Sequence, residues 1–97
     1  MRAPHLGDVV AAARALRAVP EVGRAGLLAA LFREAGAAFR HGRATGVNHP
    51  DYGDGSLMAA ALRHTCVPEP ELADRDYCRC LALVLLSLSA RSGVPDR

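Results

Sequence analysis

The residues best suited to metal chemistry lie in the second half of the chain, where His64 and Cys66 are followed by Cys78 and Cys80. Zinc sites use four such ligands, and paired cysteines are usually separated by two to four residues in a turn. Cys78 and Cys80 fall in a predicted helix, where a step of two residues turns the side chains roughly 160° apart. The pair His64 and Cys66 then lacks two further ligands. We therefore expect three free, reduced thiols, no metal and no cofactor.

Nucleophilic catalysis needs a nucleophile, a base and a group that orients the base. Ser56 follows a glycine, but the G-x-S-x-G pattern of serine hydrolases is absent. All twelve basic residues are Arg, so the chain lacks the lysine of a Walker-type phosphate loop or a Schiff base. We therefore expect a protein that is not an enzyme and has no catalytic residues.

Arginines are the candidates for contact with nucleic acid. Arg33 and Arg40 lie one heptad apart on the flank of a predicted helix, and Arg43 lies near them. Guanidinium groups suit phosphate, but no helix-turn-helix pattern or aromatic platform accompanies these arginines. The prediction is weak, non-specific DNA contact at Arg33, Arg40 and Arg43, with an ordinary solvated surface as the alternative.

The stretch NHPDYGDGS, residues 48–56, interrupts a chain that is otherwise rich in Ala and Leu. Its glycines permit a positive φ, and Asp54 and Ser56 have the oxygens that cap a following helix. These duties favour a turn. His49, Asp51 and Tyr52 have no evident structural duty, so the alternative is a partner-binding loop that displays these three side chains.

Helices must position all of these residues, because apolar residues make up 51% of the chain and aromatic residues only 4%. A core of Ala, Leu and Val favours an all-α fold. The 97 residues form one domain, 1–97, with frayed ends at 1–7 and 92–97. Apolar spacing and capping residues predict a small bundle of four helices at 9–19, 21–44, 57–64 and 75–91.

The helix predicted at 75–91 is strongly apolar. Asp74 is its expected N-cap, and its inner face is expected to carry Tyr77, Leu81, Val84, Leu85 and Leu88. Leu83 and Leu86 lie on the other side. Such a helix is either central in its domain or buried by a second subunit, so Leu83 and Leu86 are the candidate oligomer or partner face. The longest nearly apolar run, 81–90, is about half a membrane span and no apolar leader is present, which predicts a cytoplasmic protein with no membrane contact.

Three segments carry a family resemblance: GDVVAAARAL (7–16), RATGVNHPDYGDGSLMAAAL (43–62) and DRDYCRCLALV (74–84). With their spacing they resemble a small family of Rhodobacter-like alphaproteobacteria. That family lies beside the DNA-packaging genes of gene transfer agents, in the position of the small terminase subunit. The resemblance implies a non-catalytic packaging subunit that forms homo-oligomers, binds a large terminase subunit and engages DNA.

The chain departs from the usual small terminase pattern, because no N-terminal DNA-binding domain is recognisable. Specific recognition of a packaging site is therefore not expected. The alternative function is a helical protein-interaction or regulatory module of another pathway.

Overall fold

The longest element of the structure, a computed structural model that describes residues 1–91, is α2, Glu21–Thr45. Pro20 precedes it in an extended conformation, and Gly46 ends it with a φ of 77°, a left-handed value that favours glycine. The predicted range 21–44 is therefore correct to within one residue. The expected fraying of residues 92–97 lies outside the described residues.

The first helix, α1, spans Leu6–Arg17, earlier at both ends than the predicted 9–19. His5, not Asp8, is the N-cap residue: the Asp8 carboxylate accepts the His5 N–H at 2.8 Å from the third helical position. Its second oxygen accepts the Met58 N–H at 2.8 Å. Within residues 1–7, which were expected to fray, Leu6 and Gly7 are helical and the Arg2 N–H donates to the Gly55 carbonyl at 2.8 Å.

Two further helices complete the described chain: α3, Leu57–Leu62, and α4, Arg75–Arg91. As predicted, Ser56 caps α3 by accepting the Ala59 N–H at 3.0 Å, although α3 ends before the predicted His64. Asp74 caps α4 as predicted, by accepting the Tyr77 N–H at 2.9 Å. Residues 1–91 thus contain four helices and no strand, in agreement with the predicted all-α bundle.

The central helix is α1, which packs against α2, α3 and α4. Small side chains make this close packing possible, and four alanines of α1 are buried: Ala11, Ala12, Ala13 and Ala15. The sequence had suggested that α4 is either central in the domain or buried by a second subunit. Its buried side instead carries only Tyr77, Cys80, Val84 and Leu88, and Leu85, expected to be buried, is 52% exposed.

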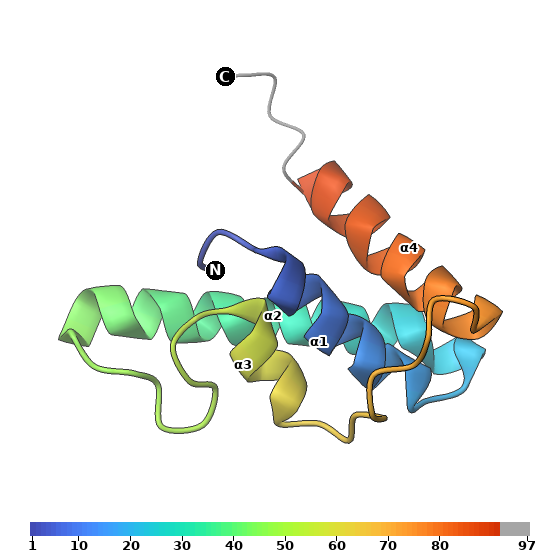
Figure 1. The fold of residues 1–97 in the computed structure, drawn as a ribbon. Coiled ribbons are helices and arrows are strands. Elements are labelled where there is room, and N and C mark those ends of the chain that lie inside the picture. Colours follow the sequence, from blue (N-terminus) through green and yellow to red (C-terminus); the bar gives the residue numbers. More distant parts are fainter. Residues whose placement is uncertain (92–97) are drawn as a thin grey trace.

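The reason for this exposure is the direction of α4. In Figure 1, α4 begins beside one end of α2 and rises away from it, so that only the side of α4 that faces α1 is covered by the body of the molecule. None of the described helices combines the length and the apolarity that a bilayer span requires. The divergence of α2 and α4 leaves the space in which the candidate site lies.

A basic groove between α2 and α4

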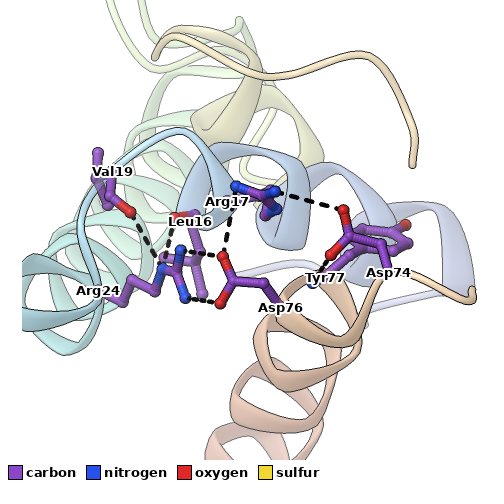
Figure 2. Close-up of polar contacts among 7 residues, drawn as sticks. All are labelled: Leu16, Arg17, Val19, Arg24, Asp74, Asp76 and Tyr77. Carbon is purple, nitrogen blue, oxygen red and sulfur yellow. Dashed lines mark hydrogen bonds and ion pairs between the residues drawn. The ribbon is translucent and has the colours of Figure 1, made fainter. Parts of the chain in front are cut away.

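One buried side chain, Arg24 of α2, fixes the narrow end of this space. Its Nη1 and Nη2 donate to both carboxylate oxygens of Asp76 of α4 at 2.7 and 2.8 Å, and its Nε donates to the carbonyl of Leu16 at 2.9 Å and of Val19 at 3.2 Å (Figure 2). Arg17 adds weaker contacts to Asp74 and Asp76 at 3.4 Å. Arg24 therefore joins α2, α4 and the carboxyl end of α1.

These contacts hold the acidic groups in their charged form. The bonds from Arg24 keep the pKa of Asp76 below its ordinary value, and the Tyr77 N–H, followed by the Arg17 contact, does the same for the pKa of Asp74. The Asp76 carboxylate in turn raises the pKa of Arg24. Sequence reasoning did not find Arg24, because nothing local marks an arginine whose partner lies 52 positions further along the chain.

Beyond this contact, α2 and α4 enclose an open groove of about 950 Å³. We call it the basic groove. Its floor is apolar and consists mainly of one side of α2 with Leu83 of α4: Ala25, Leu28, Ala29, Phe32, Gly36 and Ala37. Residues 25–40 cover about 22 Å of helix, so the groove is long enough for an extended peptide or a helix of several turns.

Four cations surround this floor: the guanidinium groups of Arg33, Arg40 and Arg91 and the α-amino group of Met1. Within residues 1–91 none of them forms an ion pair. Burial, with Arg91 and Arg40 nearby, lowers the pKa of the Met1 amino group. The groove thus concentrates positive charge that its own residues do not neutralise.

One acidic residue, Glu34, lines the groove, and its carboxylate already has partners. Its Oε1 lies 3.4 Å from Arg63 Nη1 and 3.1 Å from His64 Nε2. Arg91 lies over the Phe32 ring at 4.3 Å, which places the guanidinium over the apolar floor of the groove. An anionic group that entered between Arg33, Arg40 and Arg91 would meet three cations, while the carboxylate among the described lining residues, Glu34, is in contact with Arg63 and His64.

The structure brings together only part of the predicted DNA-contact set. Arg33 and Arg40 line the basic groove, but Arg43 is exposed outside it and stacks over Phe39 at 5.8 Å. Sequence reasoning missed Arg91 and the amino group of Met1. Arg91 had a detectable signal, because it follows Leu83 at a helical spacing of eight residues.

Leu83 and Leu86, the two leucines predicted as a partner face, also lie on different surfaces of the structure. Leu83 lines the basic groove and packs against the core, whereas Leu86 is 70% exposed. Leu83 is therefore the member of this pair that lies with Arg33 and Arg40.

In the loop between α2 and α3, the side chains of His49 and Tyr52 have structural roles that the sequence did not reveal. His49 Nδ1 accepts the N–H of Asp51 at 3.0 Å and of Tyr52 at 3.1 Å, and the two rings stack at 4.7 Å. Tyr52 also receives Arg63 over its ring at 4.8 Å and lines the basic groove. Asp51 is exposed, so it is the residue of the predicted loop set that points to solvent.

The same loop positions Met1. Asp54 accepts the Ser56 N–H at 2.9 Å and pairs with Arg2 at 2.9 Å, and Ser56 then caps α3. Together with the bond from the Arg2 N–H to Gly55, this pair holds the N-terminal residues against the loop. Met1 consequently reaches the basic groove.

A family model for a domain of unknown function, DUF7742, matches residues 2–88, which is most of the chain. The chain belongs to the DUF7742 family. No curated protein and no solved structure gives a significant match to it.

The thiols of this DUF7742 chain lie apart from the basic groove. Burial raises the pKa of Cys66 and of Cys80, which keeps both thiols protonated. Cys78, half-buried, donates to the Leu72 carbonyl at 2.9 Å. Within residues 1–91 of this family member, no three His, Cys, Asp or Glu side chains are grouped in a way that could hold a metal ion.

Proposed function

We propose that this DUF7742 protein is a non-catalytic, small-terminase-like accessory subunit of phage-like DNA packaging, which forms oligomers, binds a large terminase subunit and makes loose contact with DNA in the cytoplasm. The family resemblance of segments 7–16, 43–62 and 74–84 suggests the packaging role. The DUF7742 match covers all three segments.

The observation that carries a binding function is the basic groove. It combines an apolar floor with four cations that have no ion-pair partner in residues 1–91. Exposed apolar surface rimmed by polar groups is typical of protein interaction sites. A surface with this chemistry supports association with an acidic partner.

DNA contact has narrower support. Arg33, Arg40 and Arg43 are all exposed on α2, so their guanidinium groups are accessible to phosphate. A few phosphate contacts give weak, salt-dependent binding without sequence preference. Oligomerisation would repeat Arg43 on each copy and add such contacts together.

The second candidate is a helical protein-interaction or regulatory module of another pathway. The exposed leucines of α4, Leu85 and Leu86, favour it, because they lie outside the basic groove and offer a separate apolar surface. The packaging role would then be wrong while the binding function remained.

The test is direct binding of the purified chain to the large terminase subunit of the same genome, together with fluorescence anisotropy on a duplex of arbitrary sequence. We expect a complex with the large subunit, and DNA binding that weakens steeply between about 50 and 200 mM salt. Arg43→Glu should weaken DNA binding, whereas Arg79→Glu, an equal charge change at an exposed position of α4, should have less effect.

A chain that binds neither the large subunit nor DNA would refute the packaging role. Binding to a purified protein of another pathway, with none to the large subunit, would favour the second candidate.

A further inference from the structure

The segment between α3 and α4 has a surface that complements the basic groove. Residues 68–73, Pro-Glu-Pro-Glu-Leu-Ala, form what we call the acidic segment. Leu72 is 73% exposed, and Glu69 and Glu71 are exposed and form no ion pair within residues 1–91. The large apolar side chain of Leu72 is thus exposed to solvent. It follows two unpaired carboxylates in the sequence and precedes the start of α4.

The acidic segment is held in shape before any binding occurs. Pro68 and Pro70 restrict its backbone, the Asp74 N–H donates to the Glu71 carbonyl at 3.0 Å, and Cys78 donates to the Leu72 carbonyl. An ordered segment loses less conformational entropy when it docks than a flexible one.

The basic groove fits this segment in length, polarity and charge. Residues 68–71 span about 12 Å in an extended proline-rich conformation and residues 72–73 form a turn, so the segment is shorter than the α2 side of the groove, where residues 25–40 span about 22 Å. The apolar floor would cover Leu72. The cations Arg33, Arg40 and Arg91 would receive the carboxylates of Glu69 and Glu71, which are the charges that the groove lacks.

Groove and segment do not meet within one copy, because none of residues 68–73 lines the groove. The acidic segment joins α4 at its first turn, whereas the groove extends to Arg91 in the last turn, and the 17 residues of α4 span about 25 Å. Figure 1 shows the chain of this segment leading into the start of α4, and its bonds to the Asp74 N–H and the Cys78 thiol hold it there. Any contact between them is therefore a contact between molecules.

We infer that the acidic segment 68–73 of one copy of this chain docks in the basic groove of a second copy. The inference rests on the oligomerisation contained in the proposed function and names its surfaces. The contact is head-to-tail, so an open assembly has one free groove at one end and one free segment at the other until a ring closes.

The test uses two variants with opposite charge reversals. In the groove variant, Arg33→Glu is combined with Arg40→Glu; in the segment variant, Glu69→Arg is combined with Glu71→Arg. Native mass spectrometry and light scattering should find the wild type oligomeric and each variant shifted at least about tenfold toward monomer. A mixture of the two variants should associate again, because every groove then meets a segment of opposite charge.

The controls are Arg79→Glu and Asp51→Arg, single reversals at exposed positions outside the groove floor and the segment, which should leave the oligomer intact. Leu72→Ser, which removes the apolar contact without a charge change, should also dissociate it. Circular dichroism of each variant checks the fold, and re-association of the mixture excludes misfolding as the cause of dissociation.

A monomeric wild type, an oligomer that ignores both reversals, or variants that stay apart when mixed would each overturn the inference. Binding to the large terminase subunit is measured separately on the same samples. A wild type that binds the large subunit but fails these tests refutes only the head-to-tail contact, and an oligomer that passes them without binding the large subunit refutes only the packaging role.

Discussion

Arg24 and Asp76 form a two-point ion pair with N···O distances of 2.7 and 2.8 Å, and the same guanidinium also caps the carboxyl end of α1 (Figure 2). Arg24 is 6% exposed, and its Nε reaches two carbonyls, of Leu16 and Val19. Geometry of this kind, with a planar fork matched to a carboxylate, is available to Arg and not to Lys.

Replacement of Arg24 should therefore destabilise the fold. We expect Arg24→Met to lower the free energy of unfolding by about 2–3 kcal/mol, because two carbonyls and the Asp76 carboxylate lose their donor. Urea unfolding followed by circular dichroism measures this change. Arg33→Met, at an exposed position of the same helix, is the control and should stay within about 0.5 kcal/mol. Equal effects of the two substitutions would show that the Arg24 contacts contribute nothing beyond those of a surface arginine.

Stability should also fall in acid. The pKa values of Asp74, Asp76 and Asp54 are lowered in the folded state, so below an ordinary aspartate pKa of about 4 the unfolded chain binds more protons than the folded one. The contribution of these carboxylates to the free energy of unfolding is then constant from neutral pH down to about pH 5 and decreases below it. Urea titrations at a series of pH values measure the profile. Asp74→Asn combined with Asp76→Asn should flatten it, and an unchanged slope would show that these carboxylates are not the groups involved.

Local signals predicted much of the fold. The ends of α2 and α4 follow from Pro20, Gly46 and Asp74, residues that act on their nearest neighbours in the chain. The start of α1 was misplaced for a related reason: Asp8 does accept a backbone N–H at a helix start, but from the third helical position and not from the N-cap. A carboxylate near a helix start satisfies either pattern, and sequence alone does not separate the two.

Alanine substitutions at three glycines should distinguish the cost of a steric clash from the cost of a left-handed backbone conformation. A Cβ on Gly55 would lie 2.8 Å from Phe39 Cα, and the φ of Gly55 is 89°, so Gly55→Ala should cost about 3 kcal/mol. Gly46 also has a positive φ, but the space around its Cα is open, so Gly46→Ala should cost only about 1 kcal/mol. Gly26→Ala, in the exposed interior of α2, should instead stabilise by about 0.5–1 kcal/mol. Thermal or urea unfolding gives all three values, and a Gly55→Ala protein as stable as Gly46→Ala would contradict the close approach of the loop to α2.

The cysteines should differ in reactivity. Cys80 is 1% exposed and burial raises its pKa, whereas Cys78 is only half-buried. Iodoacetamide at about pH 8 should therefore label Cys78 in the folded protein and leave Cys80 unmodified, as read by peptide mass spectrometry. In concentrated urea the two should react alike. Labelling of Cys80 as fast as Cys78 in the folded protein would show that α4 separates from α1.

The candidate site was less accessible to sequence reasoning than the fold. Arg33, Arg40 and Leu83 were all selected, but on separate grounds, and nothing in the sequence indicated that they line one groove. That relationship depends on the angle between α2 and α4. The angle in turn depends on Arg24 and Asp76, which are 52 residues apart. Helical periodicity identifies which side of a helix is apolar, but it does not predict the angle at which a second helix packs.

The Arg24 contact lies at the first turn of α4, so a small rotation of α4 about this contact displaces its last turn by a larger distance. Asp76 lies in the first turn of α4 and Arg91 in the last, about 22 Å further along the axis, so a rotation of 5° at the contact moves Arg91 by about 2 Å. A shift of that size decides whether a charged group makes or loses a hydrogen bond. Arg24 and Asp76 do not line the groove, yet we expect substitutions there to shift Arg91 and so to change the affinity for a partner bound in the groove.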